Sequence, residues 1–121
     1  MKLEILPQEL SVYQVADLNL VDLTQQPLFI GVTAEEISIV SATDNVPTDT
    51  LEREDGWKGF KIEGVLEFSL VGILAKIASL LADANISIFA ISTYNTDYVL
   101  IKANKYEAAI VALRAGGYTV V

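Results

Sequence analysis

The alternation of apolar and polar residues predicts a strand followed by a helix in the middle of the chain. Residues 65–68 are an apolar run that suits a strand. Beyond them, apolar residues recur at helical spacing from position 71 to position 81. A helix is therefore expected to begin within a residue or two of Val71, with Ser69 offering a hydroxyl to cap it. Because the apolar side of this helix is wide, the helix should cover a sheet.

Four further elements complete the second half of the chain. Residues 86–94 form a β-branched and aromatic run that predicts a strand, and residues 98–102 predict its neighbour after a turn at Asn95 and Thr96. Residues 105–115 have the spacing of a second helix, which Gly116 and Gly117 end because glycine readily takes the left-handed conformation. Residues 118–121 form a last strand. The order βαββαβ predicts an α+β, ferredoxin-like fold with helices on one face of an antiparallel sheet.

The first half shows the same order with shorter helices. Strands are expected at residues 10–15, 28–32, 37–41 and 57–62, with residues 33–36 as a hairpin turn. Residues 16–23, with Asp17 as a cap, are a short helix or a loop, and residues 45–56 are one or two helical turns. Residues 2–6 are an extra edge strand. The sequence thus predicts two tandem modules, residues 1–63 and residues 64–121.

The second half also resembles a known family, the ACT domain, a small regulatory module that binds amino acids. The resemblance rests on a glycine at the start of the helix after the first strand, on ANISIFAIST and on TYNTDYVLI, and it is strongest to the ACT modules of aspartate kinases and of cytosolic arginine sensors. Many ACT domains have Pro-Gly where this chain has Val71-Gly72. The resemblance implies a non-catalytic regulatory protein that forms a side-by-side homodimer, which would also cover open sheet edges.

The resemblance further implies a ligand site between the loop after the first strand and the end of the second strand in a paired module. Carried over by position, the site residues are Gly64, Glu67, Phe68, Ser69, Leu70, Val71, Gly72, Thr93, Tyr94 and Asp97. Most have a structural interpretation beside the functional one. Ser69 is then a helix cap, Phe68 and Leu70 are core or interface residues, Tyr94 covers the sheet edge, and Gly72 serves close helix packing.

The ligand chemistry follows from the charges near the predicted helix start. Backbone N–H groups at a helix N-terminus favour a carboxylate, and Gly72 has no Cβ to obstruct it. Glu67 and Asp97 are the acids expected nearest this point, and they suit an ammonium group or a cationic side chain. A free amino acid, neutral or basic, is the expected ligand, and no cofactor is expected.

Composition narrows the function. The net charge of −8 opposes nucleic-acid binding, and the charge is uneven, −9 over residues 1–56 and +1 over residues 57–121. The apolar runs fall short of the ~20 residues that span a bilayer, and no secretory segment is seen, so a cytoplasmic location is expected. The chain has no histidine and no cysteine, which removes the commonest general base and the cysteine metal sites.

Two other functions stay open. One is an assembly module that keeps the fold without a ligand. The other is an enzyme built around Glu67, Asp97, Tyr94 or Lys102. The acids at positions 35 and 36, and those at 52, 54 and 55, are expected to be solvated surface charges.

Overall fold

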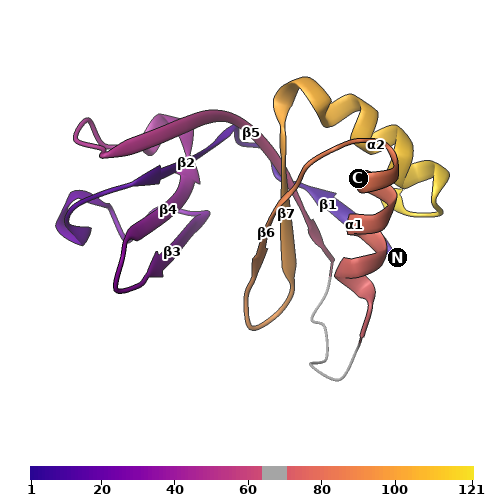
Figure 1. The fold of residues 1–121 in the computed structure, drawn as a ribbon, viewed down its shortest axis with the longest axis horizontal. Helices are drawn as coiled ribbons and strands as arrows, with labels where there is room; N and C mark the ends of the chain where they lie inside the picture. The colour runs from indigo at the N-terminus through magenta and orange to yellow at the C-terminus, as the bar shows by residue number, and fades with distance from the viewer. Residues whose placement is uncertain (64–70) are drawn as a thin grey trace. The chain divides into compact units, whose positions relative to one another are not determined.

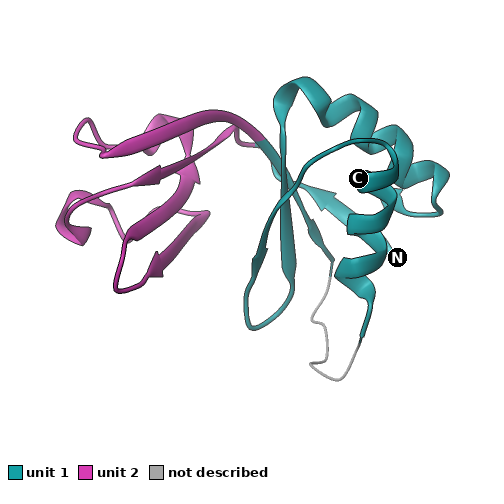
Figure 2. Ribbon diagram, viewed as in Figure 1, with its two compact units in different colours: residues 1–7, 58–121 teal, residues 8–57 magenta. Residues whose placement is uncertain are grey.

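The structure, a computed structural model, describes residues 1–63 and 71–121. They divide into two compact units, shown in Figure 2: unit 1 comprises Met1–Pro7 and Lys58–Val121, and unit 2 comprises Gln8–Trp57. The long strand β5 (Glu52–Ile62) contributes its first residues to unit 2 and its last residues to unit 1. The units therefore differ from the predicted modules at 1–63 and 64–121. Residues 1–7 and 58–63, the two ends of the first predicted module, belong to the same unit as the second half of the chain.

The described residues of unit 1 form five strands and two α-helices. Its strands lie in the order β8–β1–β5–β7–β6. Figure 1 shows both helices on the same side of these strands. The elements are β1 (Lys2–Ile5), the end of β5, α1 (Ile73–Asp83), β6 (Phe89–Ser92), β7 (Asp97–Lys102), the 3-10 helix η3 (Ala103–Lys105), α2 (Tyr106–Ala115) and β8 (Thr119–Val120). From β5 onward this is the predicted βαββαβ order.

Strand β1 corrects two expectations. It was expected as an edge strand, but it pairs with β5 on one side, Leu3 opposite Ile62, and with β8 on the other, Leu3 opposite Val120. The sheet was expected to be antiparallel throughout, but β1 and β8 are parallel. Because β1 is inserted between two strands that run in opposite directions, it must be parallel to one of them.

The core of unit 1 lies between its helices and its sheet. Helix α1 buries Ile77 and Leu81, and α2 buries Ala109, Ile110 and Leu113, all in one cluster with residues of β1, β5, β7 and β8. The helices approach closely where α2 ends, since a Cβ at Gly116 would lie 2.5 Å from Leu80 Cδ1. This packing is the reason why the apolar helix faces could be found from periodicity alone.

Both helices of unit 1 end in the same hydrogen-bonding pattern. After α2, Tyr118 N–H donates to Leu113 O and Gly117 N–H donates to Arg114 O, both at 3.1 Å, with Gly117 at φ +97°. After α1, Ile86 N–H donates to Leu81 O and Asn85 N–H to Ala82 O, both at 2.9 Å. These are Schellman motifs, which need one left-handed residue. Gly117 confirms the predicted glycine stop, while after α1 the left-handed residue is Asn85.

Unit 2 has four strands and no α-helix. Its strands are β2 (Leu10–Gln14), β3 (Leu28–Val32), β4 (Ile37–Ala42) and the first part of β5, and they lie in the order β5–β2–β4–β3 with antiparallel neighbours. Unit 2 also has two 3-10 helices. The first, η1 (Leu18–Leu20), lies within the short helix or loop predicted at residues 16–23, and the second, η2 (Thr43–Asn45), ends where the helical turns predicted at residues 45–56 begin. As expected, Asp17 caps the first, accepting from the N–H of Asn19 at 2.9 Å.

The segment before the strand predicted at residues 57–62 was assigned wrongly. Residues 45–56 were expected to make one or two helical turns, but strand β5 already begins at Glu52. A bulge makes this possible, because Leu10 pairs with Trp57 while Val12 pairs with Glu54, leaving two residues of β5 opposite Ser11. The extra residue Gly56 has φ +82°, a conformation that glycine adopts without strain.

Candidate functional site

The predicted site residues fall into two groups on the fold and one group outside the described residues. Gly64, Glu67, Phe68, Ser69 and Leu70 lie outside the described residues, as does the expected strand at 65–68. Val71 and Gly72 lie at the start of α1. Thr93, Tyr94 and Asp97 lie in and beside the turn between β6 and β7.

Gly72 is the N-cap residue of α1, which begins where the sequence predicted. It has φ +80°, so a residue with a side chain would be strained there, and its carbonyl accepts the first helical hydrogen bond from Lys76 N–H at 2.9 Å. Among the described residues, no atom would lie within 4 Å of a Cβ at this position. The backbone conformation therefore explains why this residue is a glycine. Close helix packing, the structural interpretation of Gly72, does not explain it.

A hollow of about 260 Å³ opens at this helix start. We name it the α1 hollow. Val71, 90% exposed, and Gly72 form one wall, and the turn between α2 and β8 forms another. Its described lining residues are Met1, Val71, Gly72, Ile73, Lys76, Gly116, Gly117 and Tyr118. Thr93, Tyr94 and Asp97 are not among them, so the structure does not bring the two predicted groups together in this hollow.

Sequence reasoning missed Lys76 and Tyr118 as residues of this hollow. Lys76 is a charged residue within the apolar spacing of the helix, and its Nζ lies 5.7 Å from the centroid of the Tyr118 ring. This is within the range of a cation–π contact. Burial raises the pKa of the Tyr118 phenol, so the ring stays neutral. The sequence contained a signal for Lys76. It follows Gly72 by four residues, which is about one helical turn, so its ammonium group can lie near the helix start.

The turn between β6 and β7 is held by its threonines. Thr93 N–H donates to Thr96 O at 2.9 Å, and the Thr93 hydroxyl donates to the same oxygen at 3.1 Å. The buried Thr96 hydroxyl donates to Ile62 O at 2.8 Å and so fixes the turn to β5. Beside the turn, the hydroxyl of Ser92 donates to Asp97 Oδ1 at 2.5 Å. Asp97 is thus held by its own hairpin.

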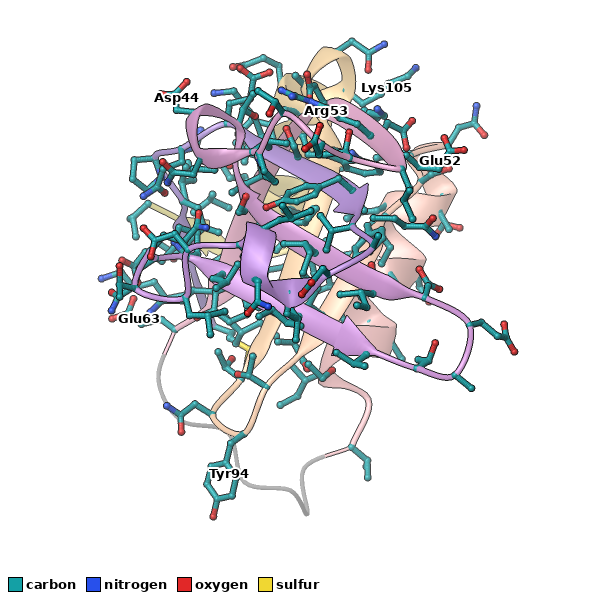
Figure 3. The ribbon with its side chains drawn as sticks, turned by 90° about the vertical axis from the view of Figure 1, so that its left-hand side faces the viewer. Asp44, Glu52, Arg53, Glu63, Tyr94 and Lys105 are labelled. Carbon is teal, nitrogen blue, oxygen red and sulfur yellow. The ribbon has the colours of Figure 1, made fainter. Side chains whose placement is uncertain are left out.

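Tyr94 projects from the tip of this hairpin, as Figure 3 shows, and is 78% exposed. A tyrosine that covered the sheet edge would be more buried. Its exposure therefore does not fit the structural interpretation of this residue.

Unit 2 has a hollow of its own. We name it the β3–β4 hollow. It measures about 290 Å³ and lies between the end of β2 and the turn between β3 and β4. Its lining includes Glu35 and Glu36, and Gln14 Nε2 donates to Glu36 Oε1 at 3.0 Å. Both acids are exposed, as expected for solvated charges.

Among the described residues, no helix is long and apolar enough to cross a membrane.

The family model of the ACT domain matches residues 52–115, from the start of β5 to the end of α2 and slightly more than half of the chain. The chain shows 29% identity, with a TM-score of 0.87, to a crystal structure of a protein from Agrobacterium tumefaciens, covering 99% of this chain and 91% of that one. No curated protein sequence matches the chain.

Two aspartate kinase structures share the fold. The regulatory subunit of aspartate kinase from Thermus thermophilus, in its ligand-free form, has 13% identity and a TM-score of 0.62, covering 93% of this chain and 95% of that one. The aspartate kinase from Synechocystis has 20% identity and a TM-score of 0.66, covering 99% of this chain but 27% of the kinase chain. With its βαββαβ order and the match over residues 52–115, the chain belongs to the ACT domain family.

Proposed function

We propose that the protein is a non-catalytic regulatory protein that binds a free amino acid at the start of α1. The observation that supports this proposal is the α1 hollow, where the N-terminus of α1 and the ammonium group of Lys76 line the same space in a member of the ACT family. The structural neighbours that are regulatory parts of aspartate kinases support a regulatory role.

The carboxylate of the ligand would lie against Val71, Gly72 and the first N–H groups of α1, with Lys76 supplying a formal positive charge. A helix terminus and a nearby cation both favour an anion, and Gly72 leaves its approach open. Glu67 and Asp97 would bind the ammonium group or a basic side chain of the ligand. The rest of the site would be lined by Gly64, Phe68, Ser69, Leu70, Thr93 and Tyr94. The two acids make a neutral or basic amino acid the preferred ligand.

The test is a thermal-shift and calorimetric screen of the full chain against the twenty amino acids. A ligand at ~100 times its dissociation constant adds about 2.7 kcal/mol of stability. Lys76→Met should weaken the binding of the selected amino acid, whereas Lys105→Met, at an exposed lysine outside the hollow, should not. If no amino acid changes the melting temperature of the folded protein, the proposal is wrong and the assembly module takes its place.

We also propose that unit 2 is a second, reduced module of the same type. When β1 is left aside, each unit has four strands that can be numbered one to four in chain order. Across the sheet, these strands lie in the order 4–1–3–2 in both units, β5–β2–β4–β3 in unit 2 and β8–β5–β7–β6 in unit 1. The two hairpins match at a constant offset of 60 residues, since residues 33–36 and 93–96 are the turns, and η2 and η3 follow their strands at positions 43 and 103. The residues before these 3-10 helices have nearly equal dihedral angles, φ −56° and ψ 138° at Ala42 and φ −56° and ψ 136° at Lys102.

Self-association is proposed through unit 1. Among the described residues, β6 pairs with β7 alone, and it holds the uncharged sequence FAIS, which suits strand pairing with a second copy. Unit 1 has seven basic and six acidic residues, so two copies can approach through it without strong repulsion. Sedimentation of the wild-type chain should show a dimer, and Ala90→Lys in β6 should shift it to monomers.

A further inference from the structure

We propose that the open edge of β3 in unit 2 binds an extended, Lys- or Arg-rich segment of another protein. Strand β3 ends the strand order of unit 2 and pairs with β4. Its five residues, LFIGV, contain no charged residue and no proline. Natural sheets usually protect an edge with such residues, so a neutral edge is suited to receiving another strand. This inference does not depend on amino-acid binding by unit 1.

The side chains along this edge are apolar and accessible. Ile30 is 40% exposed and Val32 is 60% exposed. Because side chains alternate along a strand, these two lie on the same face, together with Leu28. That face is covered in part by the segment that contains η1, through Leu18 and Val21. An incoming strand with apolar residues at every second position would bury Ile30 and Val32.

The backbone groups of the same residues are directed toward the open edge. Val15 N–H donates to Ile37 O at 3.2 Å, so the hydrogen-bonding groups of Ile37 point toward β2 and away from its β3 neighbour, Val32. Bonded and non-bonded pairs alternate along antiparallel strands. Val32, Ile30 and Leu28 therefore all direct their N–H and C=O groups outward, where a further strand can pair with them.

Charge decides which occupant fits this edge. Residues 8–57 contain ten acids and one base, Arg53, whose Nε donates to Asp55 Oδ1 at 2.9 Å. Glu35 and Glu36 lie in the turn that follows β3, and Asp44 and Glu52 project outward from unit 2 in Figure 3. Two copies meeting at β3 would bring together two units of charge −9 each. A basic segment removes this repulsion and gains long-range attraction, so the occupant is another protein.

The probe for this proposal is a short fluorescent peptide that alternates Val and Lys, titrated with the full chain and followed by anisotropy. It should bind with an affinity that falls as salt is raised, while the matched peptide that alternates Val and Glu should not bind. Val32→Ser should weaken binding about tenfold, because a buried valine contact is lost. Val111→Ser, at a valine of α2 that is 67% exposed, should leave the affinity unchanged.

Two N-methylated peptides test strand pairing without altering the protein. One carries methyl groups on the valine nitrogens and the other on the lysine nitrogens, and in a strand these two sets of N–H groups point to opposite sides. Edge pairing predicts that one methylated peptide binds and the other does not. The proposal is overturned if both bind equally, if the Val–Lys peptide fails to bind at about 1 mM, or if Val32→Ser dissociates a homodimer of the chain.

Discussion

The hydroxyl of Ser11 donates a hydrogen bond to Asp55 Oδ1 at 2.6 Å, at the point where β5 has one residue more than β2. Ser11 is fully buried, and its oxygen also lies 2.9 Å from the hydroxyl oxygen of Thr43. Arg53 Nε donates to the same carboxylate oxygen at 2.9 Å. These contacts join β2, η2 and β5, and they fix the bulge that lets β5 begin at Glu52.

Ser11→Ala should therefore lower the stability of the protein. It removes a buried hydroxyl bonded to a carboxylate, a bond worth about 1.5–3 kcal/mol. The free energy of unfolding, measured by urea titration, should fall by about 1–3 kcal/mol. Ser79→Ala, at an exposed position of α1, is the matched control and should raise stability by about 0.5 kcal/mol through helix propensity. Equal effects of the two substitutions would show that the bond contributes nothing to stability.

The two hairpin turns should be exchangeable if unit 2 is a reduced copy of the ACT module. Thr33 N–H donates to Glu36 O at 3.0 Å, as Thr93 N–H donates to Thr96 O at 2.9 Å. Placing the pair Tyr94-Asn95 at positions 34–35, and Ala34-Glu35 at positions 94–95, leaves these bonds and the buried Thr96 in place. The exchanged chain should keep its circular dichroism spectrum and change in stability by less than about 1 kcal/mol. Loss of folding would contradict a shared turn geometry.

Sequence periodicity predicted the elements whose burial is local. The strand predicted at residues 28–32 has the bounds of β3. The strands predicted at residues 37–41 and 98–102 are each one residue shorter than β4 and β7. These bounds could be predicted because the apolar runs end at turn residues. Helix α1 began where its apolar spacing indicated. Helix α1, β4 and β7 bury apolar residues whose pattern can be read from the chain itself, whereas β3 has no buried residue.

Elements that depend on distant partners were not predictable in the same way. The run Glu52 to Gly56 is charged and resembles a solvated turn, yet it forms a strand because β2 pairs with it across the bulge. Likewise, nothing in residues 2–5 indicates that both of their edges are occupied. Of the candidate site, the helix start at Gly72 was predictable, whereas Met1 and Tyr118 reach the α1 hollow only through the fold.

Asn85 should be replaceable by glycine but not by alanine. It has φ +63° and supplies the left-handed residue of the Schellman motif after α1. A residue with an ordinary Cβ is disfavoured in this conformation by about 1–2 kcal/mol, whereas glycine is not. Asn85→Ala should lower the free energy of unfolding by about 1 kcal/mol, and Asn85→Gly should leave it unchanged or raise it slightly. The comparison of the two variants is its own control, and an equal loss in both would contradict the explanation.

The ionisation of Tyr106 should lower the free energy of unfolding as the pH rises from about 10 to about 12. Burial, with a smaller contribution from Glu107, raises the pKa of Tyr106 from 10.0 to about 12. Between these values the phenol of the unfolded chain loses its proton while that of the folded chain keeps it. Deprotonation therefore favours unfolding, so the contribution of Tyr106 is complete below pH 10 and is lost as the pH approaches 12.

Absorbance titration of the phenolate band, combined with urea unfolding at several pH values, measures this effect. Tyr106→Phe should remove one high-pKa phenol from the titration and flatten the fall in stability above pH 10. It also removes the hydrogen bond from the Tyr106 hydroxyl to Gly59 O at 3.4 Å, a long bond whose loss should cost at most about 1 kcal/mol at neutral pH. Tyr94→Phe, which removes one phenol at an exposed position, is the matched control. A fall above pH 10 that persists in Tyr106→Phe would assign it to another group.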